Sequence, residues 1–201
     1  MQDKYLEYHN KRFEFYKDNV KSLWGSEYSQ QVRFKVFAKH FDLRNANILD
    51  VGCGFGDLFG FLKANNINFS NYSGFDINEN HLGVAQKKYP AANFQLVDLL
   101  KDETTDQFDF VFASGIFFLK CDNWTEYFLK MVKKMFKLSK KGIAFNLLSC
   151  HSVSPDDVSY YSKPKEIVAL LTKELSPFII LDHSYKQNDY TLFIYKHSNE
   201  I

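Results

Sequence analysis

The feature of this sequence that most constrains its fold is a glycine-rich segment directly after a short apolar run. Residues 48–57 are Ile-Leu-Asp-Val-Gly-Cys-Gly-Phe-Gly-Asp, and a helical apolar pattern begins just beyond them. Glycines permit the positive φ angles of a tight strand-to-helix turn and let a ligand approach the backbone closely. A dinucleotide fingerprint would require glycine at position 57, which is Asp57, and the sequence has no Gly-Lys-Ser/Thr of a P-loop. The segment therefore predicts a ligand-binding turn of another kind.

Short apolar runs alternate with segments of helical periodicity along the rest of the chain. These runs lie at residues 47–51, 71–77, 93–97, 108–113 and 142–148. Such alternation favours a parallel sheet with helices on both faces. Two further runs, 177–181 and 190–195, are separated only by a short polar segment that leaves no room for a crossover helix. We therefore expect them to form an antiparallel hairpin at the edge of the sheet.

The first 44 residues contain two helical patterns that are interrupted at Trp24-Gly25-Ser26. Too few apolar positions recur in this segment to close a separate core. A chain of 201 residues is also of ordinary size for a single domain. We therefore expect residues 1–44 to form a helical cap on a domain made by residues 45–201.

Two acidic residues stand at the ends of predicted strands. Asp76 ends the second strand, twenty positions after Gly56, and Asp98 ends the third. In a right-handed strand–helix–strand unit both strand ends open onto one edge of the sheet. Asp76 is thus placed to accept hydrogen bonds from the ribose hydroxyls of an adenosine group. The alternative is an N-cap role for Asp76 or Asn78, because residues 79–88 have a helical pattern.

The segment Asp50–Asp57 together with Asp76 and Asp98 resembles the class I S-adenosylmethionine-dependent methyltransferases, over about residues 45–196. This resemblance implies an α/β fold of the Rossmann-like type, a three-layer α/β/α sandwich. Its seven-stranded sheet would be mostly parallel with an antiparallel last strand, which agrees with the hairpin inferred from the residues alone. The resemblance also implies S-adenosylmethionine as the cofactor and methyl transfer as the activity.

The same resemblance assigns residues to parts of the cofactor. The turn that contains Gly52, Cys53 and Gly54 would lie against the methionine portion, which Ser114 would face from the fourth strand. At the other end of the site, Asp76 would hold the ribose and Asp98 the adenine amino group. Two apolar residues, Ile77 and Leu99, would sandwich the adenine ring.

The predicted cap supplies three further candidates for cofactor binding. Tyr8 and Trp24 are expected to shield the cofactor, and the Arg33 guanidinium suits a bidentate contact with its carboxylate. For Arg33, an ion pair with Asp or Glu is an equal alternative.

An acceptor pocket is expected beyond the cofactor, because ligands of open parallel sheets lie outside the carboxyl ends of the strands. Phe117, with Phe118, would form an apolar wall, and Asn146 and Tyr161 would make polar contacts with the substrate. His151 is the candidate catalytic residue, as a base or by orienting the substrate. The alternatives are that both phenylalanines belong to the core and that His151 is a surface residue.

Charge and composition exclude several functional classes. Twenty-five Lys and Arg balance twenty-four Asp and Glu, so we expect no nucleic acid and no anionic membrane as partner. The three cysteines have no spacing typical of a zinc site or a disulfide framework, and no metal is expected. The charged start and the lack of a long apolar run predict a cytoplasmic protein.

The remaining question is the methyl acceptor. Adenine-N6 and glutamine-N5 methyltransferases carry Asn/Asp-Pro-Pro-Tyr/Phe after the fourth strand, where this chain has Ala113-Ser114-Gly115-Ile116. The favoured hypothesis is in-line methyl transfer to a small-molecule acceptor. Methylation of RNA or protein, and a non-catalytic module that only binds the cofactor, are the alternatives. The sequence does not indicate an oligomeric state.

Overall fold

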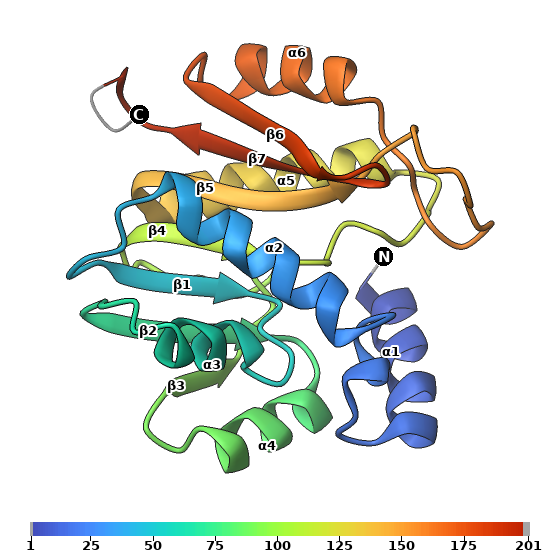
Figure 1. The fold of residues 1–201 in the computed structure, drawn as a ribbon, viewed down its shortest axis with the longest axis vertical. Coiled ribbons are helices and arrows are strands. Elements are labelled where there is room, and N and C mark those ends of the chain that lie inside the picture. Colours follow the sequence, from blue (N-terminus) through green and yellow to red (C-terminus); the bar gives the residue numbers. More distant parts are fainter. Residues whose placement is uncertain (1, 199–201) are drawn as a thin grey trace.

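The computed structural model describes residues 2–198, apart from the side chain of Gln2, and forms a seven-stranded sheet between layers of helices (Figure 1). Its helices are α1 (Gln2–Tyr16), a 3₁₀ turn η1 (Val20–Ser22), α2 (Glu27–His40), α3 (Asp57–Ala64), α4 (Glu79–Lys88), α5 (Trp124–Leu138) and α6 (Pro164–Glu174). Its strands are β1 (Asn47–Val51), β2 (Asn71–Asp76), β3 (Asn93–Leu96), β4 (Phe108–Ala113), β5 (Ser139–Leu148), β6 (Ile179–Lys186) and β7 (Asp189–Tyr195).

The strand order in the sheet is β3-β2-β1-β4-β5-β7-β6. Strands β1 to β5 pair in parallel, and β7 runs antiparallel to both β5 and β6. The predicted fold class and terminal hairpin are therefore confirmed. Val51, the last residue of β1, pairs with Phe75 on one side and Ala113 on the other. The glycine-rich turn thus leaves the sheet near the middle of its carboxyl edge.

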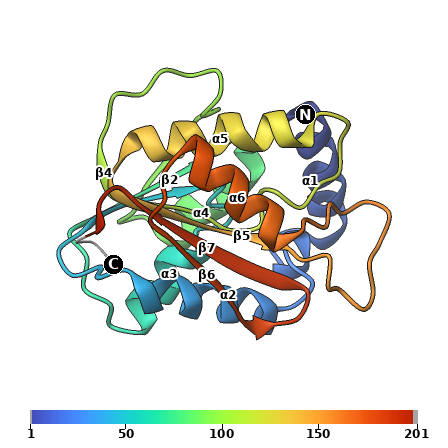
Figure 2. The same ribbon diagram turned by 90° about the horizontal axis from the view of Figure 1, so that it is seen from above.

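Helices cover both faces of the sheet, as Figure 2 shows from above. Helices α2, α3 and α4 share one apolar core with one side of the strands, whereas α5 and α6 share the other. The apolar face of α5 is buried along its length, from Trp124 to Leu138. Central strand β1 is covered on both sides, and neighbouring residues Ile48 and Leu49 are both fully buried.

The two helices of the predicted cap have different surroundings. Helix α2 packs into the core through Phe34 and Phe37 and belongs to a helical layer. Helix α1 lies instead across the carboxyl edge of the sheet (Figure 1), where the Tyr5 hydroxyl donates a hydrogen bond to the Ile116 carbonyl. Only α1 therefore lies across the sheet edge as a lid would.

Two strands are longer than their apolar runs. Strand β5 begins at Ser139, three residues before its predicted start, because it follows α5 without a loop. Strand β6 continues through the polar residues 182–186 up to the hairpin turn. As the outer strand of the sheet, β6 tolerates polar side chains that an apolar search does not detect. Among residues 2–198, no helix is long and apolar enough to span a membrane.

Candidate active site

A pocket lies at the carboxyl edge of the sheet, between the strand ends and α1. Helix α1 contributes Tyr5, Leu6 and His9 to its walls. Nine residues predicted from the sequence also line it: Trp24, Gly52, Cys53, Gly54, Asp76, Ile77, Asp98, Leu99 and Ser114. The strand ends therefore bring together side chains and backbone from four separate parts of the sequence, as the parallel arrangement requires.

The glycine-rich turn is held against the end of β2. Gly54 has a φ of +55°, and its backbone N–H donates to Asp76 Oδ2 at 2.8 Å. A Cβ atom at position 54 would lie 2.6 Å from Cδ1 of Leu23 and would be strained at this positive φ, so the position favours glycine. The sequence of this turn thus fixes Asp76 at the floor of the pocket.

Asp76 is not the N-cap of α4. That position is held by Asn78, whose Oδ1 accepts hydrogen bonds from the backbone N–H groups of Asn80 and His81. Asp76 Oδ1 instead accepts from the Asn78 N–H at 2.9 Å, and the Asp76 side chain stays in the pocket wall. The N-cap alternative therefore holds for Asn78 and not for Asp76, whose contact with a ribose stays a prediction.

Buried carboxyl groups gather beneath the turn. Burial raises the pKa of Asp50 to about 7, although the Tyr72 hydroxyl donates to it at 2.7 Å, and Asp76 and Asp57 raise it further. Burial also raises the pKa of Asp76, against the hydrogen bonds from Gly54 and Asn78. Asp57 is bound by the Gln30 amide at 2.8 Å and by Lys88. This end of the pocket favours a ligand that brings cationic or hydrogen-bond-donating groups.

The other end of the pocket is mainly apolar with one carboxylate at its rim. Leu99 is buried there beside Val97 and Met131, and Ile77 lines the same wall. Asp98 accepts a hydrogen bond from the Leu100 N–H at 3.1 Å and forms an ion pair with Lys101. Apolar walls with a carboxylate at one side suit a flat ring that carries an amino group.

Comparison with known proteins agrees with this geometry. A sequence model of the methyltransferase domain family matches residues 48–142. A putative methyltransferase of Mycobacterium tuberculosis, Rv1506c, is 26% identical over 160 residues, which cover 76% of this chain and 94% of the relative. The family match and the relative both indicate a methyltransferase, as the resemblance of the strand-end residues predicted.

Solved structures share the fold at low sequence identity. The magnesium protoporphyrin IX methyltransferase of Synechocystis PCC 6803, crystallised with bound SAH, superposes with a TM-score of 0.68 at 18% identity, and 97% of each chain is covered. The pyocyanin biosynthetic protein PhzM gives a TM-score of 0.68 at 14% identity, covering 94% of this chain and 62% of PhzM. These similarities support the methyltransferase fold.

Six predicted site residues do not line the methyltransferase pocket: Tyr8, Arg33, Phe117, Asn146, His151 and Tyr161. Tyr8 lies beside the pocket on α1, with its ring 5.3 Å from that of Phe118. Leu6 of α1 lines the pocket, and so do Tyr5 and His9, which were not among the residues predicted for the site. Their spacing of four residues is the signal that could have found them, since it places both on one face of the helix.

The predicted acceptor residues are dispersed. Phe117 is a core residue, 1% exposed and packed on Phe128 and Phe145, as the alternative for it stated. His151 is exposed, and its ring lies 5.9 Å from that of His183 in a shallow surface depression. The Tyr161 hydroxyl donates to Asp156 within the same surface loop.

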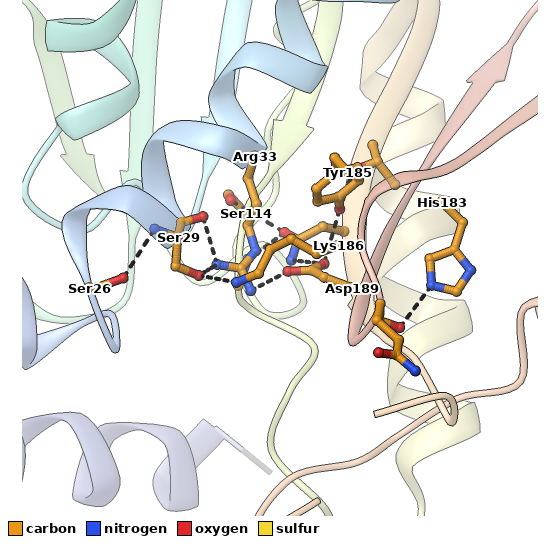
Figure 3. Close-up of polar contacts among 12 residues, drawn as sticks. Ser26, Ser29, Arg33, Ser114, His183, Tyr185, Lys186 and Asp189 are labelled. Carbon is orange, nitrogen blue, oxygen red and sulfur yellow. Dashed lines mark hydrogen bonds and ion pairs between the residues drawn. The ribbon is translucent and has the colours of Figure 1, made fainter. Parts of the chain in front are cut away.

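Arg33 is bound within the protein and does not reach the pocket. Its guanidinium forms a buried ion pair with Asp189, the first residue of β7 (Figure 3). It also lies 4.8 Å from the centre of the Trp24 ring. The structure therefore contains the ion pair that was the alternative to a cofactor contact.

Asn146 connects this ion pair to the pocket wall. Its Nδ2 donates to Asp189 Oδ1 at 3.1 Å, while its Oδ1 accepts from the Gly115 N–H at 2.9 Å and from Ser114 Oγ at 3.3 Å. Gly115 has a φ of +77°, and a Cβ there would lie 2.7 Å from the Trp24 ring. Arg33 and Asn146 thus support two pocket walls, the Trp24 ring and the loop after β4.

Proposed function

We propose that this methyltransferase transfers a methyl group from S-adenosylmethionine to a small-molecule acceptor. The observation that carries the proposal is the position of α1, which lies across the pocket and supplies part of its wall. Tyr5 ties one part of α1 to the loop after β4, and Asn10 accepts a hydrogen bond from Asn78 at the start of α4. A pocket enclosed in this way suits an acceptor of limited size.

The residues present fit the cofactor. Asp76 is buried yet faces the pocket, where its carboxylate can accept ribose hydroxyls. The backbone at Gly54 carries no side chain that would block the methionine portion, and Leu99 with Ile77 gives apolar walls for the adenine ring. Asp98 at the rim is suited to the adenine amino group.

S-adenosylmethionine supplies the activated methyl group, and the protein positions the partners. In-line transfer requires the acceptor atom about 3–3.5 Å from the methyl carbon, with the two aligned and water excluded. Leu6, Trp24 and Ile116 line the pocket with apolar surface that excludes water. A general base is needed only where the acceptor carries a proton. The supporting network of Arg33, Asp189 and Asn146 keeps Trp24 in place.

Charge and structural neighbours support a small acceptor over a polymer. A net charge of +1 offers little attraction to a nucleic acid backbone. The Synechocystis neighbour is named for a porphyrin and PhzM for pyocyanin biosynthesis, so this fold accommodates small acceptors in those proteins.

Replacing Asp76 by alanine is expected to weaken S-adenosylmethionine binding by about 1.5–3 kcal/mol, the range of hydrogen bonds to charged groups. Isothermal titration with S-adenosylmethionine measures the effect, with NAD as a control ligand. Asp106→Ala serves as the matched variant, because Asp106 is exposed just before β4, at the opposite edge of the sheet. Tight binding of NAD without binding of the methyl donor would contradict the cofactor assignment.

The acceptor class is tested by transfer of a labelled methyl group to pooled metabolites, RNA and protein. Label in a metabolite fraction is expected. Label only in RNA or protein would replace the small-molecule assignment, and binding of the donor without transfer to any pool would favour a non-catalytic module.

A further inference from the structure

Two histidines from different helices face each other at the pocket. His9 of α1 and His81 of α4 have ring centres 5.4 Å apart, with their planes nearly perpendicular at 86°. Both residues line the pocket, and His81 is only 2% exposed. They form one of the contacts between the helix that crosses the sheet edge and the helix that follows Asp76.

The polar atoms of this pair lack partners within the described part of the chain. His9 Nδ1 and His81 Nε2 are buried and make no hydrogen bond there. Their neighbours are aromatic: Phe55 lies 5.3 Å from the His81 ring, and Phe118 lies 6.1 Å from the His9 ring. A buried polar atom without a partner is costly, and native proteins rarely keep one without a functional reason. A bound ligand would supply the missing partners.

The charge state of the pair limits which ligand fits. Burial lowers the pKa of each histidine to about 4, and for His9 the neighbouring His81 and Arg12 lower it while Asp76 raises it. Both rings are therefore neutral at pH 7, and each offers one N–H donor and one acceptor nitrogen. Neutral donor-and-acceptor groups match hydroxyls, which also donate and accept, better than they match carboxylates or phosphates.

Asp76 gives the position of those hydroxyls. Asp76 and the two histidines line one pocket, and the Asp76 carboxylate raises the pKa of His9. We propose that His9 and His81 bind the ribose hydroxyls of S-adenosylmethionine opposite Asp76. The cofactor then joins α1 to α4 and completes the wall over itself. This inference rests on the proposed cofactor and adds two binding residues to its site.

The first test measures binding of S-adenosylhomocysteine, the demethylated cofactor, by isothermal titration. His9→Phe and His81→Phe keep an aromatic ring among aromatic neighbours and remove the nitrogens. Each variant is expected to bind about tenfold more weakly, the effect of one hydrogen bond. His9→Asn, whose amide retains a donor and an acceptor, should recover part of the loss. His197→Phe, at an exposed histidine, is the matched control and should bind like the wild type.

The second test uses the 2′-deoxy and 3′-deoxy forms of S-adenosylhomocysteine. Loss of the hydroxyl that His9 binds should weaken binding to the wild type about tenfold more than binding to His9→Phe, because the contact of that hydroxyl with Asp76 is lost in both proteins. Losses that multiply would show that the ring and the ribose do not interact, and would overturn the inference.

The two proposals fail in different ways. Wild-type affinity for S-adenosylhomocysteine in both phenylalanine variants would overturn only the histidine assignment. A folded wild type that does not bind S-adenosylhomocysteine would overturn the cofactor assignment and the inference with it. Thermal unfolding of each variant verifies that the protein is folded.

Discussion

Replacing Asp189 by leucine is expected to lower the free energy of unfolding by about 3–5 kcal/mol, the cost of removing one partner of a buried ion pair. Asp189 is fully buried, and its carboxylate is the counter-charge of Arg33, which is only 6% exposed. The same carboxylate accepts hydrogen bonds from Asn146 and from the Tyr185 hydroxyl. The leucine variant therefore leaves the Arg33 charge buried without its counter-charge and removes one hydrogen-bond acceptor from Asn146 and from Tyr185. Urea unfolding followed by circular dichroism measures the loss.

The double variant Arg33→Met/Asp189→Leu separates two causes of lost stability in Asp189→Leu: the unpaired buried charge of Arg33 and the change in packing. Because apolar residues of similar size often replace a buried ion pair at little cost, the double variant should recover much of the stability. Asp42→Ala, which removes the exposed ion pair with Arg44, is the matched surface control and should leave the unfolding free energy nearly unchanged. Asp189→Leu with wild-type stability would show that the ion pair does not hold β7 and α2 together.

The sheet could be predicted from the sequence because its signals are local. Each central strand is an apolar run of strand length between helical segments, and the ends of β1 and β4 agree with the prediction. The carboxyl edge follows from the same pattern, since parallel strands place their following residues side by side. Glycines and acids at those positions therefore predicted residues that line the pocket without any knowledge of distant contacts.

The rest of the pocket depends on contacts between distant parts of the chain. His81 looks like an ordinary residue of the first turn of α4, and only the position of α1 places His9 against it. Arg33 had two equal alternatives because its partner, Asp189, is near the other end of the sequence. Asn146 was expected to touch substrate because it lies near the end of β5. Its amide oxygen instead accepts a hydrogen bond from Gly115, and its amide nitrogen donates one to Asp189. A polar residue near a strand end therefore indicates the edge of the sheet more reliably than it indicates a ligand contact.

Acidification from pH 7.5 to pH 5 is expected to lower the free energy of unfolding of the wild type by about 4 kcal/mol relative to that of a His9→Phe/His81→Phe variant. Burial lowers the pKa of both histidines from 6.5 to about 4. At pH 7.5 both rings are neutral in the folded and unfolded chain, so they make no pH-dependent contribution. As the pH falls below 6.5, the unfolded chain binds protons that the folded protein does not, and the folded state loses about 2 kcal/mol per ring by pH 5.

The free energy of unfolding of the wild type alone would not reveal this loss, because buried carboxyl groups stabilise the folded protein on acidification. The raised pKa values of Asp50 and Asp76 mean that the folded protein binds their protons first, which stabilises it as the pH falls from about 7. Comparing urea unfolding of the two proteins at pH 7.5 and pH 5 cancels most of that contribution, because both proteins contain the same carboxyl groups and the variant loses only the lowering of the Asp76 pKa by His9. The variant should gain stability relative to the wild type on acidification, whereas His197→Phe should not. A difference that stays constant between the two pH values would show that the histidine pair is protonated as readily in the folded protein as in the unfolded chain, and hence that α1 does not exclude water from it.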